Sequence, residues 1–271
     1  MTRSFDLGPA LLFCPADRPD RFAKALERAD ALILDLEDAV ADDAKSTARE
    51  ALVTADLDPA RVIVRVNGAA SAHHDADVAA LATTDFRTVM LPKAADPADL
   101  ARLADYDVIA LCETAAGVLA AGALAAEANV VALMWGAEDL VVSLGGTSSR
   151  APDGRYRDVP RQARSMIALA AAAGGAAAID AVHVDIPDLA GLAEEAADAA
   201  ALGFAATACI HPSQVETIRA AYRPTDAQVR WAAELLAAAE GAPGAFAFRG
   251  AMIDEPVLRQ ARAILGRRTE R

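Results

Sequence analysis

The sequence predicts an α/β protein, a (β/α)8 TIM barrel followed by a C-terminal lid extension of helices and a hairpin. Short apolar runs alternate with Ala-, Leu-, Glu- and Arg-rich helical patterns, which is typical of a parallel sheet covered by helices. The alternation repeats eight times, which favours a closed barrel, and a barrel takes about 250 residues. The alternative is an open doubly wound sheet, but no Gly-x-Gly-x-x-Gly motif follows the first strand.

Eight apolar runs are expected to form the strands of the barrel. They are Leu11–Ala16, Ala31–Glu37, Arg61–Val66, Thr88–Lys93, Val108–Glu113, Val130–Gly136, Ala181–Ile186 and Ala205–His211. A helical pattern follows each run. These helices are Asp20–Ala29, Lys45–Val53, Asp75–Leu81, Pro97–Leu103, Val118–Glu127, Arg161–Ala173, Asp188–Leu202 and Val215–Tyr222. We therefore expect one catalytic domain over residues 1–223.

Residues 224–271 do not continue the strand–helix alternation. Asp226–Ala239 reads as a helix, Gly241–Gly244 as a flexible break, Phe246–Ile253 as a strand or hairpin and Glu255–Leu265 as a last helix. A mobile element after a hinge is the form that active-site lids take. A plain packing extension is the alternative.

Composition restricts the partners and the compartment. A net charge of -13 on 271 residues argues against nucleic acid, although an anionic small ligand remains compatible if basic residues cluster locally. Cys14, Cys112 and Cys209 form no Cys-x-x-Cys pair and lie in apolar runs, as expected of buried thiols in a reducing cytosol. With no signal peptide evident and the uncharged run Ser165–Ile179 too short to span a bilayer, we expect a cytoplasmic protein without a membrane partner.

Polar residues end most of the predicted strands. In a barrel the carboxyl ends of the strands face the active site, so these side chains are expected on one rim. Charged groups at nearly every strand end indicate a functional site rather than ordinary loop chemistry. The set comprises Asp35, Glu37, Asp38, Arg65, Asn67, Lys93, Glu113, Glu138, Asp139, His183, Asp185 and His211.

Glu113 and Asp139 close two consecutive apolar runs. Carboxylates beside buried strands are costly unless a positive partner meets them, and Mg2+ prefers oxygen ligands of this kind. Ion pairing to Arg65 or Lys93 is the alternative. Glu138 neighbours Asp139, so on an extended strand only one of the two would point inward. No His/Cys spacing supports zinc, and no Gly-x-Ser-x-Gly motif supplies a nucleophile.

The first helix carries a basic face. Arg21, Lys24 and Arg28 are at helical spacing, and Arg18 precedes them. The face is either solvated or a seat for the phosphates of a nucleotide-like cofactor such as coenzyme A. The spacing leaves both interpretations open.

Several short motifs occur in a fixed order over essentially the whole chain. They are Phe13–Phe22, Asp35–Val40, Lys45 with Arg49, Arg65–Asn67, Leu91–Lys93, Glu113–Thr114, Gly136–Leu140, Ile210–Gln214 and Gly250–Asp254. In this order they resemble the citrate lyase beta-subunit-like family, within the HpcH/HpaI aldolase and malyl-CoA lyase superfamily. The match is specific for the family and much less so for the substrate.

The resemblance implies a TIM barrel that assembles as a homotrimer or a multiple of it. It implies Mg2+, with Mn2+ possible, on Glu113 and Asp139, and a coenzyme A thioester at the barrel mouth. Arg65 would hold the substrate carboxylate or thioester oxygen. Asp254 would act from the lid across a subunit boundary. The other substrate- or coenzyme A-binding positions that it implies are Arg18, Lys24, Lys93, Gly136 and Ala137.

The implied activity is that of a carbon–carbon lyase of the EC 4.1 class. It would cleave or form a 3-hydroxyacyl-CoA thioester, such as malyl-CoA or citramalyl-CoA, to an α-keto acid and acyl-CoA by a Claisen-type mechanism. Glu37 or Asp38 would move the hydroxyl proton, Arg65 would stabilise negative charge and Asp254 would exchange a proton at the enolate carbon. Alternatives are a malyl-CoA thioesterase or malate-synthase-like activity, a coenzyme A-independent pyruvate-type aldolase, and a non-catalytic acyl-CoA-binding barrel.

One position departs from the family pattern. Family members commonly have Gly-Lys shortly before the Ile-His-Pro at the end of the last strand, where this chain has Ala206-Thr207. A basic residue at the mouth is therefore missing, which puts one contact to the acyl-CoA in question.

Overall fold

The computed structural model describes residues 5–241 and 244–269. The chain divides into two compact units, Met1–Ile218 and Arg219–Arg271. The expected domain boundary between residues 223 and 224 lies a few residues farther along the chain. The expected break at 241–244 contains residues 242–243, which lie outside the described residues.

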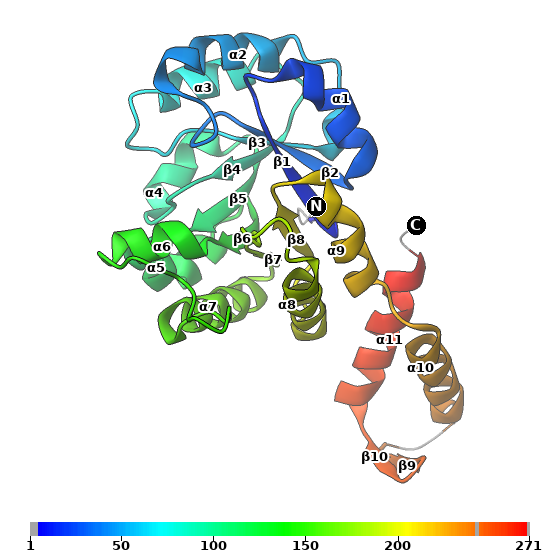
Figure 1. Ribbon diagram of the computed structural model, residues 1–271. Helices are drawn as coiled ribbons and strands as arrows, with labels where there is room; N and C mark the ends of the chain where they lie inside the picture. Colours follow the sequence, from blue (N-terminus) through cyan, green and yellow to red (C-terminus); the bar gives the residue numbers. More distant parts are fainter. Residues whose placement is uncertain (1–4, 242–243, 270–271) are drawn as a thin grey trace. The chain divides into compact units, whose positions relative to one another are not determined.

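The first unit is a closed barrel of eight parallel strands (Figure 1). Each strand pairs with the next in sequence, and β8 pairs back onto β1 through Ala10–Leu12 and Thr207–Cys209. The predicted fold class is therefore confirmed. The strands are β1 Ala10–Pro15, β2 Ala31–Asp35, β3 Val62–Arg65, β4 Thr88–Leu91, β5 Asp107–Cys112, β6 Val130–Trp135, β7 Ala177–Asp180 and β8 Ala206–Cys209.

Helices follow the strands and surround the barrel (Figure 1). Local signals set their ends. Pro19 occupies the first turn of α1, the Thr114 side chain accepts a hydrogen bond from the Gly117 N–H at the start of α5, and Gly175 ends α7 with φ 74°. No helix within residues 5–241 and 244–269 is long and apolar enough to cross a membrane. The helices are α1 Pro19–Arg28, α2 Lys45–Val53, α3 His74–Leu81, α4 Pro97–Leu100, α5 Ala115–Ala125, α6 Ala137–Ser143, α7 Asp158–Gly174, α8 Leu189–Leu202 and α9 Val215–Tyr222, with 3-10 turns at Asp42–Ala44, Pro59–Arg61, Ala101–Leu103 and Pro212–Gln214.

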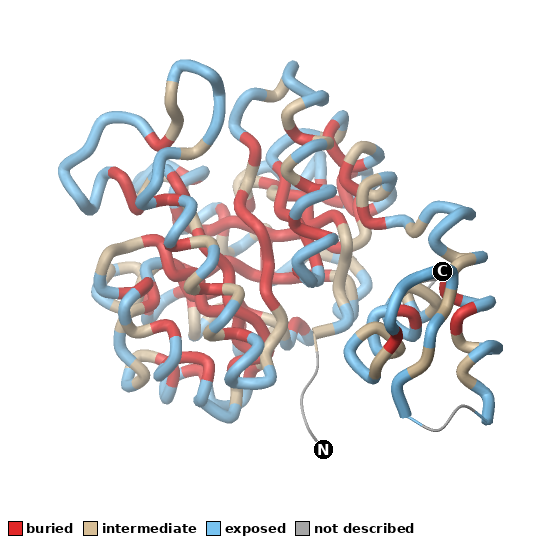
Figure 2. Tube along the Cα trace, turned by 90° about the horizontal axis from the view of Figure 1, so that it is seen from below, coloured by how far each residue is buried: buried red, intermediate tan, exposed pale blue. Residues whose placement is uncertain are grey.

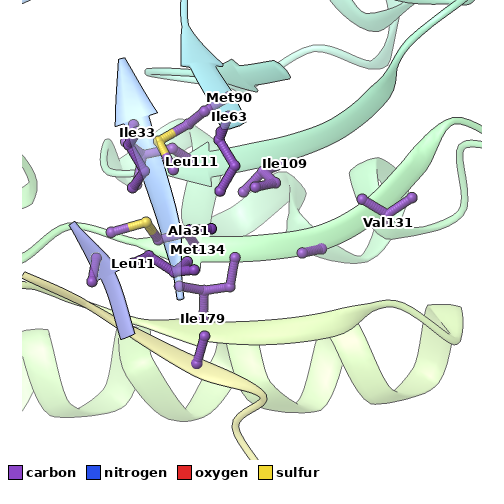
Figure 3. Packing of buried hydrophobic residues seen from close by; sticks show 13 residues of the cluster. Leu11, Ala31, Ile33, Ile63, Met90, Ile109, Leu111, Val131, Met134 and Ile179 are labelled. Atoms are coloured by element: carbon purple, nitrogen blue, oxygen red, sulfur yellow. The ribbon is translucent and has the colours of Figure 1, made fainter. Parts of the chain in front are cut away.

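Side chains fill the inside of the barrel. Figure 3 shows aliphatic and thioether groups from successive strands meeting there, among them Leu11, Ile33, Met90 and Met134, which are at most 3% exposed. Figure 2 shows buried residues concentrated in the interior of this unit and exposed residues mainly on its outer segments. The barrel is therefore a packed core, and a ligand meets it only at the ends of its strands.

The seventh strand was predicted in the wrong place. It runs from Ala177 to Asp180 and pairs with Ala132–Met134, whereas the predicted segment Ala181–Ile186 follows it without forming a strand. The chain leaves α7 at Gly175 and enters the strand after one further residue. Alanines dominate this stretch, and alanine is depleted in strands, so the pattern of residue types concealed the strand.

After the end of α9, the described part of the second unit contains two helices and a two-stranded antiparallel sheet, as the sequence predicts. Helix α10 (Asp226–Ala239) begins with a capping box formed by Thr225 and Gln228. Strands β9 (Phe246–Phe248) and β10 (Ala251–Ile253) pair, and α11 (Glu255–Thr269) follows. The small core of this unit contains Ala232, Leu235, Ile253 and Ala261. That the unit acts as a lid stays a prediction.

Candidate active site at the barrel mouth

Two neighbouring cavities, lined by described residues, open at the carboxyl ends of barrel strands, and a third lies beside the end of β7. The first, of about 370 Å3, is here called the mouth cavity. The second, of about 530 Å3, opens beside the ends of β2, β3 and β4, and Asp38 lines both. The polar groups of the mouth cavity are therefore the first candidates for chemistry. Its lining comprises Phe13, Asp35, Asp38, Ala39, Arg65, Leu111, Glu113, Met134, Trp135, Gly136, Ala137, Glu138, Asp139, Val182 and Ile210.

Arg65 is fixed by its neighbour on the adjacent strand. It is the last residue of β3 and pairs in register with Asp35, the last residue of β2. Its Nε and Nη2 donate to the two carboxylate oxygens of Asp35 at 2.7 and 2.6 Å. Asp35 also accepts from the backbone N–H groups of Glu37 and Ala39. Because the pair is bidentate and buried, the guanidinium has one orientation.

Glu37 extends this ion pair toward β4. Its Oε2 lies 2.9 Å from Nη1 of Arg65, and its Oε1 accepts a hydrogen bond from Nζ of Lys93. Burial raises the pKa of Glu37, while the charges of Arg65 and Lys93 oppose that shift. Burial alone would lower the pKa of Arg65, but the hydrogen bond and the charge of Asp35 outweigh it and raise the pKa. Arg65 is therefore a permanent cation at the mouth.

The ammonium of Lys93 forms ion pairs with several carboxylates at the rim. Besides Glu37, its Nζ lies 3.6 Å from Asp38 Oδ2, 3.8 Å from Glu113 Oε1 and 3.7 Å from Asp139 Oδ1. Its backbone is left-handed, with φ 55°. The ion pairing to Lys93 that the sequence left as an alternative is therefore present.

Glu113 is the most deeply buried carboxylate of the predicted metal pair. It follows β5, is 3% exposed, and its Oε1 accepts from the Lys93 N–H at 3.2 Å. Burial and then the charge of Asp139 raise its pKa to about 8. Gly136 makes room for it, since a Cβ there would lie 2.8 Å from Glu113 Oε2. A carboxylate in this setting needs a cation to stay ionised at neutral pH.

We expected Asp139 to lie at the end of an extended strand, but it lies in a helix. Strand β6 ends at Trp135, and helix α6 starts at Ala137, so Glu138 and Asp139 lie in its first turn. The expectation that only one of the two would point inward therefore rested on the wrong geometry. Both line the mouth cavity, and Glu138 accepts a hydrogen bond from Ser149 Oγ at 2.6 Å. Aspartate is common in first helical turns because the helix dipole favours it.

The charges at the mouth fit a divalent cation. Five carboxylates, from Asp35, Glu37, Asp38, Glu113 and Asp139, surround the two cations Arg65 and Lys93. Within residues 5–241 and 244–269 no group of three or more His, Cys, Asp or Glu side chains forms a ready metal cluster. Mg2+ uses only one or two carboxylates and keeps several waters. The pair Glu113 and Asp139 suits that ion.

Six predicted residues are absent from the linings of these two cavities. They are Arg18, Lys24 and Asp254, and the expected rim residues His183, Asp185 and His211. Arg18, directly before α1, and Lys24, on α1, are exposed, and the linings of both cavities lack them. Asp254 lies between β10 and α11 in the second unit, where its backbone carbonyl accepts from the N–H groups of Val257 and Leu258. Their proposed roles stay predictions.

The sequence analysis did not predict the roles of Lys45 and Asp77, which hold in place the segments that form the rim. Lys45, 5% exposed, donates to the carbonyls of Leu36 and Glu37 and to Asn67 Oδ1. Asp77, fully buried, accepts from both the backbone and the side chain of Asn67. Together they tie the segments that follow β2 and β3. The motif that pairs Lys45 with Arg49 was the available signal, but Asp77 gave none.

A second, partly buried network anchors the loop between α6 and α7. Arg150 donates to Glu195 and stacks over the ring of Tyr156 at 3.9 Å. His183, one of the expected rim residues, lies 2.8 Å from Glu195 through Nδ1. Tyr156 in turn meets the Trp135 ring edge-on at 5.1 Å. The loop is therefore connected to the wall of the mouth cavity.

Comparisons of the sequence and of the structure with known proteins identify the same group of proteins. Residues 10–212 match the HpcH/HpaI aldolase/citrate lyase family. The chain is 55% identical over 263 residues to a citrate lyase subunit beta-like protein of Mycobacterium tuberculosis (strain ATCC 25618 / H37Rv), covering 97% of this chain and 96% of that protein. It is 33% identical over 286 residues to the mitochondrial citramalyl-CoA lyase of Homo sapiens, covering 93% and 83%. Its structure matches that of the protein CitE from Mycobacterium tuberculosis in complex with magnesium, acetoacetate and coenzyme A, with a TM-score of 0.93 and 55% identity over 96% of this chain and 98% of that one.

Proposed function

The chain belongs to the HpcH/HpaI aldolase/citrate lyase family, and on that premise we propose that it is a Mg2+-dependent carbon–carbon lyase. Its substrate would be a 3-hydroxyacyl-CoA thioester such as malyl-CoA or citramalyl-CoA, which it would cleave to, or form from, an α-keto acid and acyl-CoA. The observation that carries the proposal is the mouth cavity, where a fixed guanidinium faces an excess of carboxylates. The magnesium, acetoacetate and coenzyme A of the Mycobacterium tuberculosis complex support it.

Glu113 and Asp139 would hold the metal ion, for which Mn2+ is an alternative. When bound, it would supply Lewis-acid polarisation of the substrate oxygens. The raised pKa of Glu113 supports this assignment, because a group that burial makes reluctant to ionise gains most from a cation at close range. Gly136 and Ala137 border the same cavity and would let the substrate approach the backbone there.

Arg65 would stabilise the negative charge that develops during cleavage. In that step the hydroxyl gives up its proton and its oxygen becomes the keto oxygen. The bond between the hydroxyl-bearing carbon and the α-carbon of the thioester breaks, and its electron pair becomes that of the thioester enolate. The guanidinium would hold the thioester oxygen or the substrate carboxylate by charge-assisted hydrogen bonds. Asp35 fixes it before the substrate arrives, so little reorganisation is needed.

Glu37 and Asp38 were both candidates for moving the hydroxyl proton, and their surroundings differ. Glu37 is buried and bound to Arg65 and Lys93, and it is absent from the lining of the mouth cavity. The Asp38 side chain is 58% exposed and lines that cavity. We therefore assign proton transfer to Asp38 and the positioning of the two cations to Glu37.

The remaining parts of the proposal concern partners. Asp254 would exchange a proton at the enolate carbon from the lid of a neighbouring subunit in a homotrimer or a multiple of it. Arg18 and Lys24 would meet the phosphates of coenzyme A, which their exposure permits. Cys14, Cys112 and Cys209 are buried, which suits the reducing cytoplasm that we propose for this chain.

The test is a cleavage assay on the purified full-length chain with Mg2+. Malyl-, citramalyl- and hydroxymethylglutaryl-CoA are offered in turn, and keto acid and free coenzyme A are followed separately. We expect keto acid release that EDTA and Asp139→Ala both abolish. Free coenzyme A without keto acid would instead identify a thioesterase. Activity on a hydroxy-keto acid alone would identify a coenzyme A-independent aldolase, and binding without turnover a non-catalytic barrel.

A further inference from the structure

The ammonium of Lys93 occupies an unusual position among the cations of the mouth. Four carboxylates lie within 4 Å of its Nζ, and they come from two sides. Glu37 and Asp38 follow β2, whereas Glu113 and Asp139 follow β5 and β6. The second pair is the one that would hold the divalent cation.

The contacts on the two sides are not equal. The ammonium donates a hydrogen bond to Glu37, but it lies 3.8 Å from Glu113 and 3.7 Å from Asp139, which are ion-pair distances. The ammonium can therefore move away from Glu113 and Asp139 and keep its hydrogen bond to Glu37. The second cavity, which Lys93 lines, gives the side chain room to move away.

The backbone of Lys93 is placed to serve the same carboxylate. At φ 55° the residue is in the left-handed region, which is unfavourable for a non-glycine residue. In this conformation its N–H donates to Glu113 Oε1 at 3.2 Å. Glu113 would therefore keep one fixed hydrogen bond if the ammonium moved away.

A divalent cation at Glu113 and Asp139 would lie close to the same ammonium. Like charges a few ångströms apart repel each other even in water, and they repel more strongly in a partly buried site. The ammonium and the metal ion therefore compete for the same carboxylates, and holding both close to them at once is unfavourable.

We propose that Lys93 is a built-in countercation that competes with the metal ion for Glu113 and Asp139. Metal binding would displace the ammonium toward Glu37 and Asp38. Lys93 would thus keep the mouth electrically balanced before the metal ion arrives and would weaken metal binding. The inference rests on the proposed function, because it takes Glu113 and Asp139 as the metal ligands.

The test measures metal affinity directly on the full-length chain, without thioester. Mg2+ binding is followed by calorimetry and Mn2+ binding by electron paramagnetic resonance. We expect Lys93→Met to bind both ions about tenfold more tightly, equivalent to about 1.4 kcal/mol. Lys93→Gln, which keeps a donor for Glu37, should shift in the same direction. Lys93→Arg, which keeps the charge, should stay near the unsubstituted protein.

Arg102→Met is the matched control for the loss of one positive charge. Arg102 is exposed and pairs with Asp75, away from the four carboxylates, so its loss should leave metal affinity unchanged. A second readout is the melting temperature, which Mg2+ should raise more in Lys93→Met than in the unsubstituted protein.

The outcomes separate the two hypotheses. Unchanged or weaker metal binding in both Lys93→Met and Lys93→Gln would overturn the countercation proposal while leaving the metal site in place. An equal gain in Arg102→Met would overturn it too, because the effect would then reflect net charge alone. No metal binding by the unsubstituted protein, together with no lyase activity, would overturn the proposed function itself.

Discussion

Replacing Arg65 by methionine should remove both stability and activity, for two separable reasons. The change leaves Asp35, which is 1% exposed, without the cation that holds both of its oxygens. Breaking a buried ion pair by removing one partner costs about 3–5 kcal/mol. For a chain of this size each kcal/mol lowers Tm by about 2–4 °C, so the expected fall is about 6–20 °C. A folded barrel of ordinary stability would survive this at 25 °C, with a reduced margin.

Arg164→Met is a matched control for the stability loss. Arg164 makes a similar bidentate pair with the buried Asp180, at 3.0 and 2.9 Å, and it does not line the mouth cavity. Asp180 would still accept a hydrogen bond from Trp135 Nε1, so the wall of the mouth should stay in place. Stability is measured by urea unfolding, and lyase turnover well below both melting transitions.

The two variants should lose similar stability and differ in turnover. Arg65→Met should lower kcat about 100-fold or more, as the removal of a donor to developing negative charge does in other enzymes. Arg164→Met should leave kcat close to that of the unsubstituted protein. Equal losses of kcat would refute the catalytic role of Arg65, and a stability loss under about 1 kcal/mol in Arg65→Met would refute the ion-pair argument.

Three further predictions concern the metal pair and the lid. Gly136→Ala should weaken Mg2+ binding about tenfold, since the new Cβ would lie 2.8 Å from Glu113 Oε2; Gly122→Ala, with open space around its Cβ, is the calorimetric control. Because burial and then the charge of Asp139 raise the pKa of Glu113 from 4.5 to about 8, the folded state binds a proton that the unfolded state releases. The stability due to this group, measured without divalent cations, should therefore fall as pH rises from about 4.5 to 8, and Glu113→Gln should remove the decline; parallel pH profiles for both proteins would contradict this. Mixed oligomers of Asp254→Asn and Asp139→Ala should regain turnover that neither variant has alone, whereas a lid acting within its own subunit would leave them inactive.

The barrel could be predicted because its strands are continuous apolar runs separated by helical patterns. Lys45–Val53 and Asp226–Ala239 form helices with the bounds that the sequence predicts. The seventh strand was misplaced because Ala177–Ile179 has no branched or aromatic residue apart from its last. The Gly174-Gly175 pair does mark the turn before this strand, but it does not fix the bounds of the strand in the alanine-rich residues that follow.

The sequence allowed us to predict which residues lie at the candidate site, but not how their side chains contact one another. Strand ends meet at one rim in any barrel, so the positions of Arg65 and Glu113 near the mouth followed from the fold. That Lys93 would touch four carboxylates did not follow, because those contacts depend on side-chain directions and on a left-handed backbone. Asp77 was missed because it acts behind the rim, through Asn67.

Because of its position, Trp135 can report ligand binding at the mouth through its fluorescence. The chain has two tryptophans; Trp135 forms part of the mouth wall, and Trp231 packs in the core of the second unit. With Trp231→Phe, the remaining indole emission would report from a fixed ring, held by Asp180 and contacted edge-on by Tyr156. A change in that emission on adding Mg2+, keto acid or thioester would follow each binding event separately, at protein concentrations far below those that calorimetry needs.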